Sequence, residues 1–174
     1  GKPYDFSMDL FPKLLEAGKL YGYVSRGYWS DIGSLGQYLK SHHHLLQGGV
    51  EGALVNASLG PGKVGIHVGT GTDIHPEAIM EPPIFIGQNS RVERGANLGP
   101  YTVIGDGVFV GPHCTIEHSI LWPNTYIGAD TEIKGAVICQ DVRVKPRARI
   151  FEGAVIGSGT VLGQGATIRP NVKI

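Results

Sequence analysis

Residues 68–174 repeat an apolar residue at every sixth position, and we call these positions anchors. A first run of nine anchors comprises Val68, Ile74, Met80, Ile86, Val92, Leu98, Ile104, Val110 and Ile116. After a slip of one residue the spacing resumes at Ile127 and Ile133, and after a second slip it continues at Val144, Ile150, Ile156, Leu162, Ile168 and Ile174. A period of six is neither that of a helix nor the simple alternation of a strand, so it indicates a repeat architecture.

The residue four positions after each anchor is small, hydroxylic or β-branched. We expect these side chains to point inward beside the anchors: Thr72, Ala78, Ile84, Ser90, Ala96, Thr102, Val108, Cys114, Ile120, Thr131, Val137, Ala148, Ala154, Thr160, Ala166 and Val172. Glycine recurs directly after the anchors, at Gly69, Gly87, Gly99, Gly105, Gly111, Gly128, Gly157 and Gly163. This position suits a tight bend, which favours a residue without Cβ.

Short extended hexapeptides separated by bends suit a solenoid of triangular cross-section, with three hexapeptides in each coil. Successive coils would stack as parallel strands about 4.8 Å apart, and residues 68–174 would form about six coils. This pattern resembles the hexapeptide-repeat, left-handed parallel β-helix family. The resemblance implies the left hand, because parallel crossover connections are otherwise almost always right-handed.

Residues 1–49 show a different pattern. Two short strands are predicted at residues 20–24 and 28–30, and a capping box of Ser34 and Gln37 opens a helix that Gly48 ends. Within this helix, large side chains recur at helical spacing, at Leu35, Tyr38, Leu39, His42, Leu45 and Leu46. We therefore divide the chain into residues 1–49, a linker at 50–67 and the solenoid at 68–174.

Composition narrows the class of protein. The chain carries 15 Lys plus Arg against 15 Asp plus Glu, and this zero net charge argues against binding to nucleic acid or to a membrane surface. Its 27 glycines and 11 prolines indicate many turns, whereas 41% hydrophobic residues suffice for a buried core. Cys114 and Cys139 are too few for a disulfide framework, which favours a reducing, cytoplasmic location. Because the chain begins with Gly1 and ends while the repeat still runs, we expect it to be part of a longer polypeptide.

Three segments near the N-terminus resemble the closing part of sugar nucleotidyltransferase domains: residues 5–12 (DFSMDLFP), 20–23 (LYGY) and 27–34 (GYWSDIGS). Within that family the likeness is greatest to bacterial mannose-1-phosphate guanylyltransferases, and residues 120–124 (ILWPN) and 150–157 (IFEGAVIG) also fit this group. The resemblance implies that residues 1–49 are the α/β end of a Rossmann-like catalytic domain. It also implies a reaction in which a nucleoside triphosphate and a sugar 1-phosphate, with GTP and mannose 1-phosphate favoured, give an NDP-sugar and pyrophosphate.

Asp31 is the candidate metal ligand. Trp29, Asp31 and Gly33 match the family's Trp-x-Asp-x-Gly motif, and the resemblance implies that this Asp helps to bind Mg²⁺ in the intact enzyme. A hard carboxylate oxygen suits Mg²⁺. The alternative is that Asp31 is only a turn residue ahead of the Ser34 helix. No Gly-rich nucleotide loop occurs in the chain, so we expect no catalytic residue within it and no activity for these residues alone.

Histidines leave a rival enzyme class open. Many hexapeptide-repeat proteins are acyltransferases that use a His as general base, and the candidates here are His67, His75, His113 and His118. The alternative is that these are exposed corner residues. A metal shared by His42, His43 and His44 is disfavoured, because consecutive helical residues project from different sides. A non-catalytic regulatory relative is the third possibility.

Two groups of outward-facing residues complete the candidate sites. Four alternating cations, Arg143, Lys145, Arg147 and Arg149, form either a solvated surface or an anion or effector site, as resemblance to ADP-glucose pyrophosphorylases suggests. The outward aromatic residues are Phe85, Tyr101, Phe109, Trp122, Tyr126 and Phe151. Such residues favour an interface with a second copy or with the catalytic domain. The interface candidates are Phe109, Trp122, Tyr126 and Phe151, and we expect a homo-oligomer.

Overall fold

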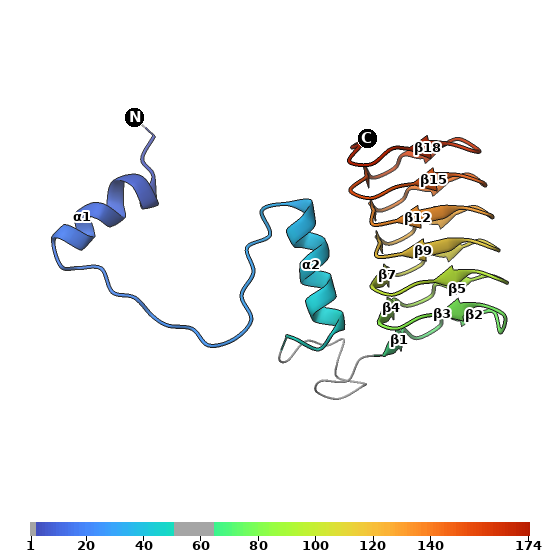
Figure 1. Cartoon of the computed structure of the whole chain (residues 1–174), viewed down its shortest axis with the longest axis horizontal. Helices are drawn as coiled ribbons and strands as arrows, with labels where there is room; N and C mark the ends of the chain where they lie inside the picture. The colour runs from blue at the N-terminus through green and yellow to red at the C-terminus, as the bar shows by residue number, and fades with distance from the viewer. Residues whose placement is uncertain (1–2, 51–64) are drawn as a thin grey trace.

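A computed structural model describes residues 3–50 and 65–174. Eighteen short strands form three parallel sheets of six, and each coil of the chain contributes one strand to each sheet. Figure 1 shows the coils stacked on one another along a straight axis. The expected fold class, mainly β with a parallel solenoid of about six coils, is confirmed.

The three sheets are named A, B and C. Sheet A contains β1 (Ile66–Val68), β4 (Ile84–Ile86), β7 (Thr102–Ile104), β10 (Ile120–Leu121), β13 (Val137–Ile138) and β16 (Val155–Ile156). Sheet B contains β2 (Asp73–Ile74), β5 (Arg91–Val92), β8 (Phe109–Val110), β11 (Tyr126–Ile127), β14 (Arg143–Val144) and β17 (Val161–Leu162). Sheet C contains β3 (Ile79–Met80), β6 (Asn97–Leu98), β9 (Thr115–Glu117), β12 (Glu132–Lys134), β15 (Arg149–Ile150) and β18 (Thr167–Ile168).

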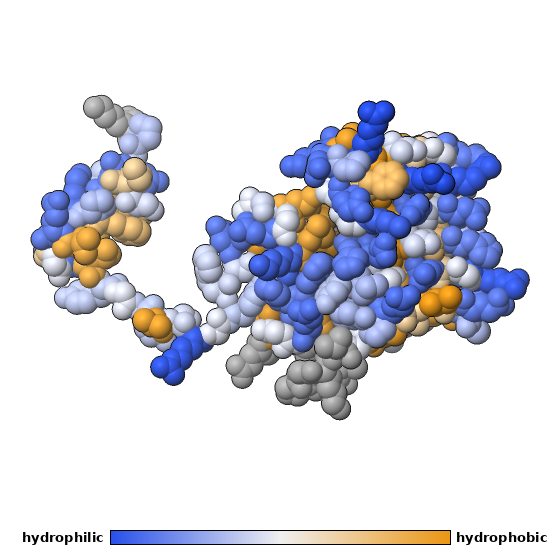
Figure 2. Space-filling view, viewed as in Figure 1, coloured by the Kyte–Doolittle hydropathy of each residue, from blue (hydrophilic) through white to orange (hydrophobic). Residues whose placement is uncertain are grey.

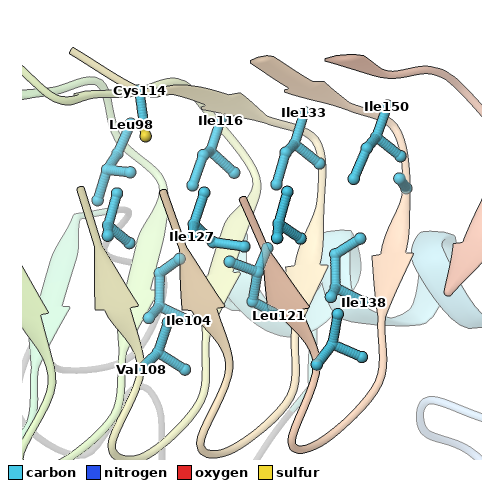
Figure 3. Packing of buried hydrophobic residues seen from close by; sticks show 14 of the residues in the cluster. Leu98, Ile104, Val108, Cys114, Ile116, Leu121, Ile127, Ile133, Ile138 and Ile150 are labelled. Atoms are coloured by element: carbon cyan, nitrogen blue, oxygen red, sulfur yellow. The ribbon is translucent and has the colours of Figure 1, made fainter. Parts of the chain in front are cut away.

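The anchors form the core of the solenoid. Those of the middle coils are buried, and Figure 3 shows Ile116, Ile133 and Ile150 in a row, pointing inward from successive coils of sheet C. The first anchor, Val68, is 42% exposed and the last, Ile174, is 51% exposed, because both lie on terminal coils. The period of six is therefore a record of which side chains face the interior.

The two slips in the period are two shortened corners between sheets C and A. Only two residues separate β9 from β10, and only two separate β12 from β13. The inward side chains of β10 and β13 are Leu121 and Ile138, which are in register with each other. Leu121 also pairs with Ile104, and Ile138 with Ile156. The predicted inward direction of Ile120 and Val137 is wrong. Each corner is one residue shorter, so the strand after it is shifted by one residue, and side chains that alternate between two faces then point to the opposite face.

The N-terminal part contains helices and an extended segment. A π-helical turn, η1 (Phe6–Leu10), leads into α1 (Phe11–Glu16), and α2 (Leu35–Leu46) follows later. The strands predicted at residues 20–24 and 28–30 are wrong: this stretch pairs with no strand in the described part of the chain, and Tyr23 is 92% exposed. Two short strands are not stable without a partner or a face to bury. The α/β character expected for residues 1–49 is thus not seen.

Helix α2 begins and ends where the sequence predicts. The Ser34 hydroxyl accepts a hydrogen bond from the Gln37 N–H at 3.2 Å, and Gly48 follows the helix with a φ of 75°. The helix lies alongside sheet A (Figure 1). It covers an outward column of apolar residues that are in register across the sheet, Phe85, Val103, Ile120, Val137 and Val155. Ile120 and Val137 are therefore only 3% exposed although they face out of the solenoid.

Three further features are the linker, the cysteines and the character of the helices. Most of the predicted linker at 50–67 lies outside the described residues, and β1 begins at Ile66. Cys114 and Cys139 are free thiols. None of the helices in residues 3–50 and 65–174 has the length and apolarity that crossing a membrane requires.

Candidate functional site

Asp31 lies in an open pocket between the extended segment and α2. The pocket has a volume of about 260 Å³ and is lined by Tyr28, Trp29, Ser30, Asp31, Gln37, Lys40 and His44. Its wall thus combines one carboxylate, one ammonium group and several neutral hydrogen-bonding groups. Such a set can bind a polar ligand through both its anionic and its cationic parts.

A hydrogen-bond network at the start of α2 holds the segment that carries Asp31. Gln37 Oε1 accepts from the Gly33 N–H at 3.1 Å and from the Ser34 hydroxyl at 3.2 Å. The Ser41 hydroxyl donates to the Gln37 carbonyl at 2.8 Å and lies 3.1 Å from the Ser30 hydroxyl. These bonds fix the backbone on both sides of Asp31. A Cβ on Gly33 would make only ordinary contacts, and nothing in the described residues explains the glycine there.

The opposite side of the pocket is set by Tyr28 and His44. Their rings meet edge to face with centroids 5.3 Å apart, and His44 Nδ1 lies 3.1 Å from the Tyr28 hydroxyl. Trp29, by contrast, is 82% exposed. Tyr28, Lys40 and His44 were not identified from the sequence, since no motif there links them to Asp31.

The pocket does not contain a complete set of metal ligands. Among the described residues no group of three or more His, Cys, Asp or Glu side chains could hold a metal ion. The exposed Asp31 carboxylate is a suitable single ligand for Mg²⁺, which prefers one or two carboxylates together with water and phosphate oxygens. The donor chemistry of Asp31 therefore fits Mg²⁺, but it accounts for only one of the ligands that the ion requires.

The four histidines considered as general bases occupy ordinary positions in the solenoid. His67 stacks on Phe85 with ring centroids 4.8 Å apart, and His75 Nδ1 accepts from the Glu77 N–H at 3.1 Å. His113 and His118 occupy corners with φ values of 56° and 50°. Two pockets beside α2 are lined by other histidines: His44 lines the Asp31 pocket, and His42 lines a second pocket together with Leu45 and Phe85.

The three consecutive histidines of α2 have three different surroundings. His42 Nδ1 lies 3.0 Å from the Tyr38 carbonyl, whereas His44 meets Tyr28. His43 faces the solenoid, with its ring centroid 4.4 Å from that of Tyr101 and 5.7 Å from that of His118. Its Nε2 is buried and has no hydrogen-bond partner among the residues that the structure describes. Burial, followed by the nearby charges of His118, His42 and His44, lowers the pKa of His43.

The four candidate cations are divided between two faces. Arg143 and Lys145 are on sheet B, Arg147 is at the next corner with a φ of 64°, and Arg149 is on sheet C. Arg149 Nε lies 4.0 Å from Glu132 Oε2. An anion or effector site formed by all four stays a prediction.

The outward aromatic residues fall into two groups. Phe85, Tyr101 and Trp122 meet α2: Phe85 lines a pocket with Leu45 and Leu46, and Tyr101 and Trp122 hydrogen-bond to side chains of α2 and its C-terminal end. Phe109 and Tyr126 stack on sheet B, away from α2, with centroids 4.9 Å apart. Phe151 is half-buried after β15.

The chain is similar in sequence to proteins named as sugar-1-phosphate nucleotidyltransferases. It is 28% identical over 191 residues to glucose-1-phosphate adenylyltransferase of Desulfitobacterium hafniense, covering 95% of this chain and 45% of that protein. It is 28% identical over 173 residues to UTP–glucose-1-phosphate uridylyltransferase of Synechocystis, covering 97% of this chain and 39% of that protein. The chain thus spans less than half the length of these relatives.

Solved structures share the fold. GDP-perosamine N-acetyltransferase of Caulobacter crescentus matches with a TM-score of 0.57 and 21% identity over 62% of this chain and 50% of that one. A second structure of perosamine N-acetyltransferase from the same organism gives 0.55 and 16%, over 58% of this chain. At these identities the likeness concerns the fold alone. The model of the EIF2B subunit epsilon LbH domain matches residues 63–168, more than half of the chain, and the chain belongs to this family.

Proposed function

We propose that this chain is the C-terminal part of a nucleotide-sugar pyrophosphorylase, which converts a sugar 1-phosphate and a nucleoside triphosphate to an NDP-sugar and pyrophosphate. The observation that supports this proposal is the extent of the sequence similarity. It runs through both the Asp31 segment and the solenoid, over 95% and 97% of the chain, in two relatives named for nucleotidyl transfer to glucose 1-phosphate. The likeness to the acetyltransferase structures covers only 62%.

In this proposal residues 1–49 complete the catalytic domain. Apolar side chains of this part are unusually open: Tyr21, Tyr23 and Trp29 are at least four-fifths exposed, and Figure 2 shows apolar groups at the surface of α1. Large exposed apolar patches are typical of surfaces that another protein part covers. The solenoid would then serve assembly or regulation, and α2 would link it to the catalytic domain.

Asp31 would contribute one carboxylate to the binding of Mg²⁺, which when bound neutralises phosphate charge while the sugar phosphate attacks the α-phosphorus and pyrophosphate leaves. The Gly33–Gln37 and Ser30–Ser41 hydrogen bonds would hold this carboxylate in a fixed place. Lys40, in the same pocket, would attract a phosphate group by its charge.

The finer proposal is that the substrates are GTP and mannose 1-phosphate. It rests on the resemblance of residues 120–124 and 150–157 to mannose-1-phosphate guanylyltransferases. The relatives named above act on glucose 1-phosphate. The nucleotide and the sugar phosphate that the enzyme uses must therefore be determined by a direct assay.

The test is pyrophosphate release by the full-length gene product with Mg²⁺, across four nucleoside triphosphates and a panel of hexose 1-phosphates. We expect turnover with GTP and mannose 1-phosphate, and a loss of about 100-fold or more in kcat/KM for Asp31→Asn. The matched control is Asp141→Asn, since Asp141 is an exposed corner residue that accepts a hydrogen bond only from Asn124 among the described residues. Silence across the whole panel would overturn the proposal, and full activity of Asp31→Asn would remove Asp31 from it.

An acyltransferase is the second candidate, favoured by the acetyltransferase structures that share the solenoid. Saturable binding of acetyl-CoA, together with acetyl transfer that a His118→Ala variant loses, would support it. A non-catalytic relative that uses the fold for assembly is the third candidate. An upstream sequence without a Gly-rich nucleotide loop would favour this third candidate.

A further inference from the structure

The outer face of sheet B carries a regular column of exposed residues that the proposed reaction does not use. One residue from each coil contributes, in the register Asp73, Arg91, Phe109, Tyr126, Arg143 and Val161. Tyr126 is 40% exposed and Val161 is 57% exposed. Helix α2 lies on sheet A, so it leaves this face open.

The centre of the face is aromatic. The rings of Phe109 and Tyr126 stack with an interplanar angle of 5°. Beside them, two residues further along each strand, stand Gly111 and Gly128, which have no side chains. A rigid aromatic centre bordered by charged residues is the arrangement that protein interfaces favour, because aromatic side chains bury much area at little cost in conformational entropy.

The two ends of the face carry opposite charge. At one end Arg91 Nε lies 2.7 Å from Glu93 Oε1 and 3.9 Å from Asp73 Oδ2, so two carboxylates surround one guanidinium group. At the other end Arg143 and Lys145 form no ion pair with any residue in the described ranges. One end is therefore net acidic, and the other is basic and unpaired.

These charges are placed symmetrically about the aromatic stack. Glu93 is one coil before Phe109, and Lys145 is one coil after Tyr126, in the neighbouring column of the same sheet. A two-fold axis that runs along the strands and passes between Phe109 and Tyr126 would set each residue against its counterpart from the other end. Glu93 would then face Lys145 of a second copy, and Phe109 would face Tyr126 of that copy. Arg91, whose charge the adjacent carboxylates of Glu93 and Asp73 already balance, would face Arg143.

We propose that the outer face of sheet B binds a second copy of this chain, with the two solenoid axes antiparallel. The aromatic pair forms the centre of this isologous contact, and the acidic end of each copy meets the basic end of the other. The parallel arrangement is disfavoured, because it would bring together the basic ends of the two copies, each with Arg143 and Lys145, and likewise their two net acidic ends. The contact does not depend on the reaction proposed above.

The experiment is sedimentation equilibrium of the 174-residue chain over a concentration series, which distinguishes the 18.5 kDa monomer from a dimer of twice that mass. We expect a dimer whose dissociation constant rises about 10-fold or more in Tyr126→Ser. Lys145→Glu is expected to weaken it by about 10-fold, and the double variant Glu93→Lys with Lys145→Glu to restore it, because the swapped charges again face each other. Arg169→Glu, the same charge change beside sheet C, is the control and leaves the constant unchanged.

Three outcomes would overturn the proposal. The first is a monomer at about 200 μM, well above typical dissociation constants of specific complexes. The second is a dimer that is indifferent to Tyr126→Ser, which would place the contact on another face. The third is a dimer that Lys145→Glu tightens, as expected only for the parallel arrangement. Circular dichroism of each variant checks that it is folded.

Discussion

The Trp122 indole N–H donates a hydrogen bond to the Tyr38 hydroxyl at 3.0 Å and so joins residues 84 positions apart in the chain. A second bond, from Gln47 Nε2 to the Tyr101 hydroxyl at 2.6 Å, joins the C-terminal end of α2 to another corner. Between these two bonds the helix packs on the apolar column of sheet A. The contact between α2 and the solenoid is therefore fixed by polar bonds at two levels and by apolar packing between them.

Removing the Trp122–Tyr38 bond is expected to loosen α2. Trp122→Phe keeps an apolar ring but loses the donor, and we expect a loss of about 1 kcal/mol in the free energy of unfolding. A double-mutant cycle with Tyr38→Phe, measured by urea unfolding, should give a coupling energy of about 0.5–1.5 kcal/mol. Tyr23→Phe, in the exposed segment before α2, is the control. Strictly additive effects of the two variants would contradict the prediction.

Acidification is expected to weaken the same contact through His43. Its ring faces Tyr101 and His118 from the solenoid and has His42 and His44 beside it on α2, and no carboxylate contributes to its lowered pKa. Because its pKa is depressed below 6.5 in the folded chain, the unfolded chain binds more protons as the pH falls below that value. The stabilisation by neutral His43 is thus fully present above pH 6.5 and decreases below it.

The measurement for this prediction is hydrogen exchange of the α2 amides between pH 7.5 and pH 5, corrected for intrinsic exchange. The protection of these amides should decrease as the pH is lowered in the native chain. It should decrease less in His43→Phe, which keeps the ring stacking and cannot be protonated. His75→Phe, at a corner remote from α2, should behave like the native chain. Equal pH dependence in His43→Phe would show that another group is responsible.

The period of six was sufficient to predict the solenoid, its coil number and most of its core, because each anchor is a direct record of an inward side chain. It could not locate the shortened corners. An 11-residue interval between Ile116 and Ile127 shows that one residue is missing, but Ile120 and Leu121 are both aliphatic, and either could face inward. The same holds for Val137 and Ile138. Only the covering helix α2 explains why both members of each pair are apolar.

The candidate site was predictable where its structure is local. The capping box of Ser34 and Gln37 predicts the start of α2, and Asp31 lies three residues before the N-cap residue Ser34. The contact of His43 with Tyr101 and His118 was not predictable, since it joins segments that share no pattern. The prediction of strands at residues 20–24 and 28–30 is wrong for a related reason. The residues of a segment indicate only its preference for an extended conformation, and a strand also requires a neighbouring strand with which to pair.

The two thiols are expected to differ strongly in reactivity. Burial raises the pKa of Cys114 to about 11, and its thiol donates to the Gly128 carbonyl at 3.1 Å. Cys139 is partly exposed in the groove near Tyr38 and Trp122, and burial raises its pKa as well. Iodoacetamide at pH 8 should therefore label Cys139 at least about 100-fold faster than Cys114, as followed by peptide mass spectrometry. In Cys139→Ser, labelling should require urea, and rapid labelling of this variant without urea would contradict the prediction.

Glycines that follow the anchors are expected to be required only where another coil closes over them. A Cβ on Gly111 would lie 2.8 Å from both the Ala129 nitrogen and the Ile127 carbonyl oxygen, whereas a Cβ on Gly163 would meet nothing within 4 Å. Both glycines follow an anchor on sheet B, but β17 is the last strand of that sheet. Gly111→Ala should cost about 1–3 kcal/mol in urea unfolding, because backbone atoms of the next coil must move.

Gly163→Ala should change stability by no more than about 0.5 kcal/mol, or increase it slightly by restricting the unfolded chain. Since the two glycines hold the same place relative to their anchors, this pair of variants separates the effect of close coil stacking from that of the bend itself. Equal losses in both would mean that the bend requires glycine for its backbone conformation. A loss confined to Gly111→Ala would mean that the recurring glycine records the spacing between coils, which the sequence pattern alone does not reveal.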